Sequence, residues 1–568
     1  MDLHVVVGGA AGQGVETVAY VLAKSLARAG FGVVANRDYM SRVRGGHNFA
    51  RIRVAADTPW SCEARADLLI ALNQQTYTLH QPTLTAKARI VYDDATVQLP
   101  PDEQRGLPVG LVELAREAGG AVMANTVAVG AALRAMNLPL AQAEEVLAEL
   151  FADKPGVPEQ NVVALRAGYE AAGPGCAEEC FSLPEPKAAG TKRLYIEGNE
   201  VLGLAALASG CRFMAAYPMT PSTGIMSFLA ARQSDHDIVV EQAEDEIAAL
   251  NMVLGASFAG ARAMTATSGG GFALMVEALS LAGMTETPAV IVVGQRPGPA
   301  TGLPTRTEQG DLSFVVSGGH GEFPRAVLSA VGLEDAFYRL NRAFELADRY
   351  QTPVIFLSDQ HFADTARTIE PFDFGRLSHE RHLVDRAALV SPYKRYAYTE
   401  SGVSPRALPG QFTGEVVLAD SDEHDECGHI IEDAETRRLM MDKRLQKLAG
   451  LAGEMDEPLI HGETEPAILL LGWGSTYGAL REAVDQLRAA GLPVGLLHFA
   501  DLWPLPQGRL RQAIRKARVT FCIEQNATGQ LATLLRAAAG VDPDHLILKY
   551  DGRPFFPAEI AQEVKARV

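Results

Sequence analysis

Three short segments of this 568-residue chain combine residue types that could bind and transform a small acidic molecule. The first is YPMTPS at 217–222, a turn with three hydroxyl side chains after an apolar run. The second is an acidic run ending at Glu246, whose carboxylate could transfer a proton. The third contains Arg306, a cation suited to gripping a carboxylate through two parallel hydrogen bonds. Each segment follows a predicted strand, as the loops of a ligand site at one sheet edge would.

The acidic run has an ordinary structural explanation as well as a chemical one. Glu241, Glu244, Asp245 and Glu246 precede a helix rich in Ala and Gly. Carboxylates in the first turn of a helix gain ~0.3–1 kcal/mol each from the helix dipole. The helix dipole is a sufficient explanation for most of these acidic residues, and at most one of them is expected to act in catalysis.

The elements that must position these segments follow an alternating pattern of apolar strands and helices, which predicts an α/β fold of three doubly wound modules with an irregular connector. A Pro- and Gly-rich stretch near residue 182 marks a linker. After Asp373 the pattern loosens into Pro-, His- and charge-rich sequence with one basic helix. The predicted domains are a first module at 1–182, a second at 191–373, the connector at 374–465 and a third module at 466–568.

Composition narrows the function further. The formal charge of −18 disfavours nucleic acid and anionic membrane as partners, because both require a basic surface. No apolar run reaches ~18 residues and the chain opens directly on a strand, which predicts a cytoplasmic protein without a membrane span or a signal peptide. The six cysteines are scattered except for Cys176 and Cys180, a pattern that gives no framework for an iron–sulfur cluster.

Two other motifs are weaker. The N-terminal GGAAGQG has the spacing G-x-x-G-x-G and not G-x-G-x-x-G, so nicotinamide binding is not predicted. The segment around His424, Cys427 and His429 has the spacing H-x2-C-x-H, which lacks a fourth ligand and matches no common zinc pattern. We therefore predict no metal bound by this chain.

The three chemistry-bearing segments resemble, in sequence and order, the thiamine-pyrimidine domain of the α subunit of 2-oxoacid:ferredoxin oxidoreductases. The N-terminal module, with YMSRVRGGHNFARIRV, resembles the γ subunit of the same enzymes, fused ahead of the α portion. The last module, with GWGSTYGA and EQNATGQLATLL, is similar to their transketolase C-terminal-like domain. The resemblance implies a γ-like domain, a thiamine pyrimidine-binding domain, a connector and a C-terminal domain, in the ranges above.

The resemblance also implies roles for individual residues. Glu246 is implied to be the carboxylate that activates thiamine diphosphate, because the small-residue helix after it has the same offsets as the helix after the activating glutamate in transketolase-like enzymes. Glu244 is the alternative. Thr220 and Arg306 contact the 2-oxoacid, and Gln309 and Asp311 orient the arginine. Tyr217 and Pro218 are implied to contact the cofactor. A further loop is implied to face coenzyme A, and the alternative for this loop is a basic turn between strands without a ligand. Its residues are Arg42, Arg44, Gly45, Gly46, His47 and Asn48.

Partners follow from what the chain lacks. The family's diphosphate-binding motif, G-D-G followed by Asn, is missing, which implies a β-type subunit that supplies Mg²⁺, the diphosphate site and a 4Fe–4S cluster in a dimer of αβ heterodimers. The reaction implied is the oxidative decarboxylation of a 2-oxoacid with coenzyme A, which yields acyl-CoA, carbon dioxide and reduced ferredoxin, or the reverse of this reaction. Among the 2-oxoacids, 2-oxoglutarate is favoured. Alternatives are a pyruvate or branched-chain 2-oxoacid oxidoreductase, an E1-type thiamine dehydrogenase component and a non-catalytic scaffold subunit.

Overall fold

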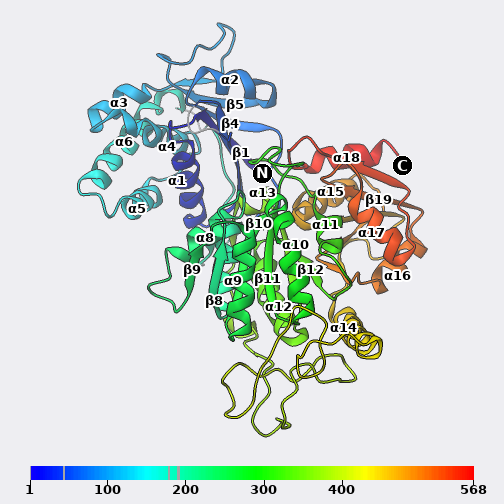
Figure 1. Cartoon of the computed structure of the whole chain (residues 1–568). Helices are drawn as coiled ribbons and strands as arrows, with labels where there is room; N and C mark the ends of the chain where they lie inside the picture. Colours follow the sequence, from blue (N-terminus) through cyan, green and yellow to red (C-terminus); the bar gives the residue numbers. More distant parts are fainter. Residues whose placement is uncertain (1, 42–44, 177–179, 188–191) are drawn as a thin grey trace. The chain divides into compact units, whose positions relative to one another are not determined.

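The computed structural model describes residues 2–41, 45–176, 180–187 and 192–568 (Figure 1). The described chain forms two compact units, each considered by itself below. The first contains residues 1–197, 364–371 and 556–558, and the second contains residues 198–363, 372–555 and 559–568.

The first unit is built on an eight-stranded mixed sheet in the order β6-β5-β4-β1-β3-β2-β14-β7. β1 pairs in parallel with β4 and antiparallel with β3, so the sheet changes from parallel to antiparallel at β1. The strands are β1 Leu3–Ala10, β2 Gly32–Asp38, β3 His47–Ala55, β4 Ala66–Ala71, β5 Leu84–Tyr92, β6 Gly106–Pro108, β7 Leu194–Glu197 and β14 Thr365–Ile369.

Two strands of this sheet lie outside the first predicted module. β14 pairs antiparallel with β2 and with β7, through Ala366 opposite Ala35 and opposite Glu197. Residues 194–197 and 364–371, which the sequence pattern assigned to the second module, therefore belong to the first compact unit. The sequence pattern singled out neither strand, and local periodicity carries no information about a pairing partner more than 300 residues away.

The helices of the first unit pack through small residues. A Cβ on Gly130 would lie 1.9 Å from the Leu165 carbonyl oxygen, and a Cβ on Gly168 would lie 2.0 Å from that of Val127, so these glycines let α4 and α6 approach closely. The helices are α1 Val15–Arg28, α2 Gln74–His80, α3 Leu111–Ala118, α4 Ala124–Ala135, α5 Ala141–Leu150 and α6 Val157–Ala171. Cys176 and Cys180, which follow α6, form a disulfide.

The second unit contains a seven-stranded sheet in the order β18-β12-β13-β11-β10-β8-β9, parallel except for β18. β10, β11 and β13 are buried at every residue because helices cover both faces of the sheet, and β11 and β13 are accordingly mostly apolar. The strands are β8 Cys211–Ala216, β9 Val239–Gln242, β10 Arg262–Ser268, β11 Ala289–Gln295, β12 Ala326–Ser329, β13 Pro353–Asp359 and β18 Asp501–Trp503.

Helices of the second unit connect these strands or follow them. α9 and α10, drawn in green in Figure 1, follow β9 and β10. α12 has acidic residues in its first turn and Arg349 in its last, as the helix dipole favours. The helices as far as the connector are α7 Gly198–Ala208, α8 Thr223–Ala230, α9 Glu246–Phe258, α10 Gly269–Met284, α11 Leu312–Ser317, α12 Leu333–Tyr350 and α13 Gln360–Ala363.

A five-stranded sheet completes the second unit, in the order β15-β17-β16-β19-β20. Its apolar residues share one core with the seven-stranded sheet, in which Trp473 and Phe272 are both fully buried. The remaining elements are α14 Ala434–Glu454, β15 Leu459–Gly462, β16 Ile468–Trp473, α15 Tyr477–Ala489, β17 Val494–Phe499, α16 Gly508–Lys516, β19 Val519–Glu524, α17 Gln530–Ala539, β20 His545–Leu548 and α18 Pro557–Lys565.

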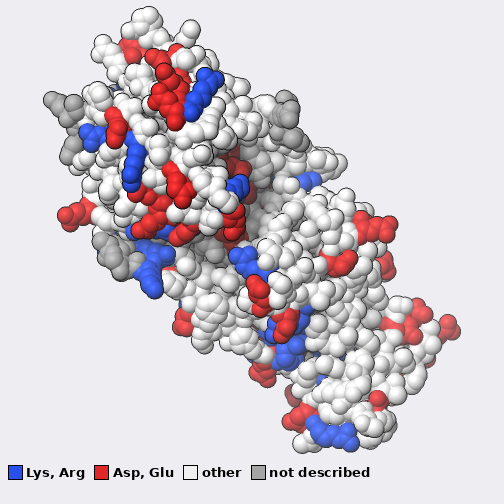
Figure 2. Space-filling model, turned by 90° about the vertical axis from the view of Figure 1, so that its left-hand side faces the viewer, with Lys and Arg blue, Asp and Glu red and all other residues white. Residues whose placement is uncertain are grey.

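The predicted basic helix of the connector is α14, and the α/β class is confirmed. Over the described ranges no helix combines the length and apolarity that crossing a bilayer requires. On the face shown in Figure 2, acidic residues are spread widely and Lys and Arg form only small separate groups. This distribution agrees with the net charge of −18.

Candidate active site at the carboxyl edge of the seven-stranded sheet

The order of strands reverses at β8. The chain runs from β8 to its neighbour β9 and then returns to β10 on the other side of β8. The loops that leave β8 and β10 therefore diverge, and open parallel sheets bind ligands where strand order reverses in this way. The three chemistry-bearing segments follow β8, β9 and β11, which places them at this edge.

Glu246 is the first residue of α9. Asp245 caps the helix, with its Oδ1 accepting a hydrogen bond from the Ala248 amide at 2.7 Å. Glu246 is 3% exposed, and its Oε1 is buried without a hydrogen-bond partner. Glu244, the alternative, is exposed. A buried acceptor without a partner is costly in a folded protein, so Glu246 fits a ligand that brings a donor to this oxygen.

The first turn of α10 lies against this carboxylate. A Cβ on Gly271 would lie 2.6 Å from Glu246 Oε1 and 2.0 Å from Thr267 Oγ1, so only glycine permits the contact. The hydroxyls of Thr267 and Ser268, at the end of β10, are also buried without partners. The sequence pattern did not identify these hydroxyls, whose only signal is their place at the carboxyl end of a strand.

The YPMTPS segment follows β8 and leads into α8. Ser222 occupies the N-cap position, but its hydroxyl donates to the Met219 carbonyl at 2.8 Å and makes no cap bond. Thr220 precedes a cis peptide bond to Pro221 and is partly exposed. Its carbonyl accepts a hydrogen bond from Arg296 Nη1 at 2.7 Å. Tyr217 is 41% exposed and Pro218 is half-buried, so both can contact a ligand.

Arg306 lies in the loop after β11 and is 9% exposed. Its Nη1 donates to the Thr305 carbonyl at 3.0 Å. Gln309, which we expected to orient Arg306, instead donates to the Trp473 carbonyl at 2.8 Å and accepts from the Gln525 amide at 3.1 Å. Gln309 therefore joins the loop to the five-stranded sheet, a tertiary contact with no local sequence signal.

Asp311 adds a second buried carboxylate oxygen without a partner, Oδ2. A Cβ on Gly269 would lie 2.3 Å from this oxygen, so Asp311 contacts the start of α10 as Glu246 does. Burial raises the pKa of Asp311 from 3.8 to about 6, while nearby Arg296 opposes the shift. Unpartnered polar groups thus gather around the first turn of α10, where a polar ligand ring would satisfy them.

The predicted coenzyme A loop lies in the first unit. Arg42 and Arg44 lie outside the described residues, while Gly45 and Gly46 have φ of 75° and 76° and lead into β3. His47 and Asn48 are strand residues and not part of the loop. His47 is buried, with its Nε2 2.9 Å from His80 Nε2, and its pKa is lowered by burial. Asn48 accepts a hydrogen bond from the Met40 amide.

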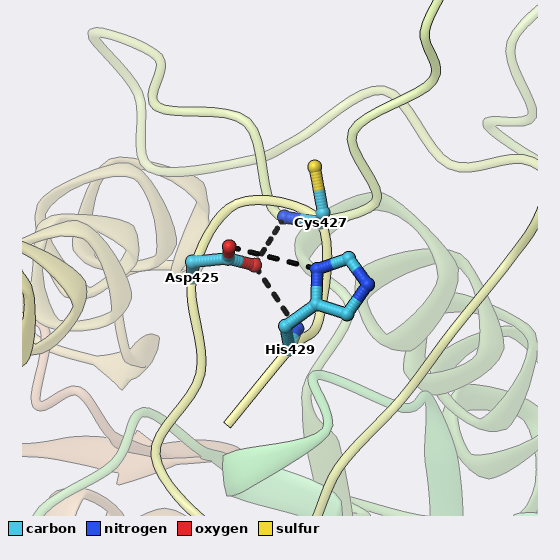
Figure 3. Close-up of side chains that lie close together, drawn as sticks. All are labelled: Asp425, Cys427 and His429. Atoms are coloured by element: carbon cyan, nitrogen blue, oxygen red, sulfur yellow. Dashed lines mark hydrogen bonds and ion pairs between the residues drawn. The ribbon is translucent and has the colours of Figure 1, made fainter. Parts of the chain in front are cut away.

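The segment that invited a metal interpretation forms a tight turn, shown in Figure 3. Asp425 Oδ1 accepts hydrogen bonds from the amides of Cys427 at 2.9 Å and His429 at 3.0 Å, and His429 Nδ1 lies 3.6 Å from Asp425 Oδ2. The ligand atoms of the three residues lie within 4.8 Å of one another. His424 is buried and its ring packs against that of Tyr396 at a tilt of 44°, and it is not a member of this group. The turn contacts explain the cluster, and the absence of a metal remains a prediction.

Comparisons with known proteins cover the whole chain. Residues 4–171 match the family model described as pyruvate ferredoxin/flavodoxin oxidoreductase. Residues 204–443 match the thiamine diphosphate-binding model of pyruvate flavodoxin/ferredoxin oxidoreductase. Residues 467–560 match core domain II of pyruvate:ferredoxin oxidoreductase. The alpha subunit of 2-oxoacid:ferredoxin oxidoreductase 2 from Aeropyrum pernix is 31% identical over 100% of this chain and 97% of its own length. This chain belongs to the alpha subunits of the 2-oxoacid:ferredoxin oxidoreductases.

Two further relatives refine the placement within the family. The 2-oxoglutarate oxidoreductase subunit KorA of Mycobacterium tuberculosis is 33% identical over 75% of this chain and 65% of its own length. A solved structure of 2-oxoglutarate:ferredoxin oxidoreductase from Magnetococcus marinus, with 2-oxoglutarate, coenzyme A and succinyl-CoA bound, superposes with a TM-score of 0.92 at 32% identity and covers 100% of this chain and 99% of its own. The family resemblance expected from the sequence is confirmed.

Proposed function

We propose that this chain is the alpha subunit of an enzyme that oxidatively decarboxylates 2-oxoglutarate with coenzyme A to succinyl-CoA, carbon dioxide and reduced ferredoxin, or runs the reverse reaction. The family membership and the Magnetococcus marinus structure with its bound 2-oxoglutarate and coenzyme A support this choice. The observation that carries it is the buried carboxylate of Glu246, with an unpartnered oxygen at the switch point of the sheet.

Glu246 is the residue proposed to activate the cofactor. Thiamine diphosphate, when bound, supplies the carbon nucleophile for the 2-oxoacid. The unpartnered Oε1 of Glu246 fits a hydrogen bond with the ring nitrogen of the aminopyrimidine, and the carboxylate would hold a proton there. Burial of Glu246 and exposure of Glu244 favour Glu246 for this role. Tyr217 and Pro218 are proposed to contact the same ring.

Thr220 and Arg306 are proposed to bind the substrate. Both lie in loops at the carboxyl edge, and a planar guanidinium matches a carboxylate better than an ammonium does. The loop from Arg42 to Asn48 is proposed to face coenzyme A through the residues outside strand β3. The division into γ-like, pyrimidine-binding, connector and C-terminal domains is proposed as the evolutionary organisation, alongside the two compact units.

A partner subunit follows from the alpha-subunit naming of the relatives. We propose that a β-type subunit supplies the diphosphate site, Mg²⁺ and a 4Fe–4S cluster and passes electrons to ferredoxin, in a dimer of αβ heterodimers. The absence of a G-D-G…N motif from this sequence supports that division of labour. The scattered cysteines do so as well.

The test is to copurify this chain with its β-type partner and to measure viologen reduction with a panel of 2-oxoacids. We expect coenzyme A-dependent reduction that is fastest with 2-oxoglutarate. The chain expressed alone should be colourless. Absence of reduction with every 2-oxoacid, or an iron–sulfur cluster stoichiometric with this chain alone, would contradict the proposal.

A further inference from the structure

Arg296 stands at the same sheet edge as the proposed substrate residues and had no role in the sequence prediction. It directly follows the last residue of β11, Gln295. Its Nη1 donates to the Thr220 carbonyl at 2.7 Å, and its Nη2 lies 3.5 Å from Met219 Sδ. The guanidinium therefore lies against the backbone of the YPMTPS segment, beside Thr220.

The charge of Arg296 has no counter-ion in the described part of the chain. No carboxylate there approaches its guanidinium within 4 Å, whereas Arg262 in the same sheet pairs with Asp348 at 2.8 Å. Burial lowers the pKa of Arg296 and Asp311 opposes the shift, but an arginine keeps its charge in proteins. Asp311 attracts this half-buried cation without forming an ion pair with it, so the site is suited to a further anion that is not part of the chain.

Arg296 also has donors to offer. A guanidinium carries five N–H groups, and the contacts with Thr220 and Met219 use two of them. The remaining N–H groups can form the two parallel hydrogen bonds that carboxylates accept from arginine. Two parallel hydrogen bonds would fix the orientation of the bound carboxylate, which a charge alone would not do.

The loop that carries Arg296 brings it into the same structural element as Arg306. Pro297 and Leu303 close the loop, with the Leu303 amide donating to the Pro297 carbonyl at 3.1 Å. The Arg306 amide in turn donates to the Leu303 carbonyl at 3.1 Å. Two arginines thus flank one closed loop, one beside Thr220 and one proposed to hold the carboxylate next to the reacting carbonyl.

We propose that Arg296 binds the second, distal carboxylate of a dicarboxylic 2-oxoacid and so selects dicarboxylic over monocarboxylic substrates. This inference rests on the proposed function of the same site. Arg296 could alternatively act only by holding the Thr220 backbone. In that case its loss would affect every 2-oxoacid equally, which gives the two roles different outcomes.

The test compares Arg296→Gln with wild type in the reconstituted complex. Gln keeps a donor for the Thr220 carbonyl but removes the charge. We expect kcat/KM for 2-oxoglutarate to fall about 10- to 100-fold, as for loss of a charged hydrogen bond, while kcat/KM for 2-oxobutanoate changes less than about 3-fold. Inhibition by glutarate should weaken similarly, while inhibition by butyrate should not.

Arg212→Gln is the matched control, because Arg212 also donates to a backbone carbonyl, that of Asp237, but is exposed at the opposite end of β8. It should leave both substrates unaffected. Equal loss for 2-oxoglutarate and 2-oxobutanoate, or unchanged glutarate inhibition in Arg296→Gln, would overturn the inference. A wild-type complex inactive with every 2-oxoacid would instead overturn the proposed function.

Discussion

Buried carboxylates occur in two different settings in the second unit. Glu286, 1% exposed, lies between Lys443 and Lys447 of α14, with Lys443 Nζ 2.6 Å from its Oε1 and 2.9 Å from its Oε2. At the carboxyl edge of the sheet, Glu246 is buried and Asp311 is half-buried, and each has one buried carboxylate oxygen without a partner. The first carboxylate is fully neutralised by its own chain, whereas the other two are not.

The difference separates a structural role from a ligand-binding role. Burial alone would raise the pKa of Glu286, but Lys447, Lys443 and Arg395 together lower it well below the ordinary value. That carboxylate stays ionised and fixes α14 to the sheet domain. Glu246 Oε1 and Asp311 Oδ2, at the sheet edge, accept no hydrogen bond from the chain. A ligand that donates hydrogen bonds to them would explain why they are buried. The following variants test this contrast, in order of decreasing effect.

The largest effect is expected from Glu286→Gln, which leaves two lysines buried beside a neutral amide. Removing one partner of a buried ion pair costs ~3–5 kcal/mol, and we expect the free energy of unfolding in urea to fall by that amount. Asp442→Asn on the exposed face of α14, where Asp442 pairs with Arg438 at 3.3 Å, is the control and should change little. Equal stability of Glu286→Gln and wild type would remove the structural role of the cluster.

Glu246→Gln should leave folding intact and reduce turnover. The amide keeps the shape of the side chain but cannot hold the proton, so we expect kcat in the reconstituted complex to fall at least ~100-fold, with unchanged cluster content. The urea midpoint should match that of wild type. Glu244→Gln is the control. Slow turnover in the Glu244 variant with normal turnover in the Glu246 variant would transfer the role to Glu244.

Arg306→Lys keeps the charge but loses the paired hydrogen bonds with the substrate carboxylate. We expect the KM for the 2-oxoacid to rise by an amount equivalent to ~1.5–3 kcal/mol, with the KM for coenzyme A unchanged. Thr220→Val should shift the same constant more weakly. Wild-type KM values in both variants would exclude these residues from the substrate site.

Asp311→Asn should produce the smallest effect, and one that depends on pH. The pKa of Asp311 in the fold, about 6, lies above the ordinary 3.8, so the native state binds more protons than the unfolded state between these values and loses stability as pH rises through them. The variant should therefore exceed wild type by roughly 2 kcal/mol at pH 8. At pH 4 the two should unfold at the same urea concentration, and a constant difference across this range would contradict the assignment.

Much of this site followed from the sequence because its signals are local. The strands ending at Ala216, Gln242 and Gln295, which precede the three chemistry-bearing segments, were predicted from the alternating pattern of strands and helices, and α9 begins at Glu246 as the acidic run indicated. The contacts of Gln309 with Trp473 and of Arg296 with Thr220 could not be predicted, since they join segments 76 or more residues apart. The resemblance to a family assigned the roles that spacing alone left open.

The pairing of β14 with β2 has a consequence for the growing chain on the ribosome. When synthesis reaches Glu197, β2 is paired with β3 on one side, and its other edge waits for Thr365–Ile369. At usual rates of translation this delay lasts roughly 10–30 s. An exposed strand edge can pair with a neighbouring chain during that time. Release of the nascent protein before residue 369 should therefore favour aggregation, and a chaperone that shields this edge would raise the yield.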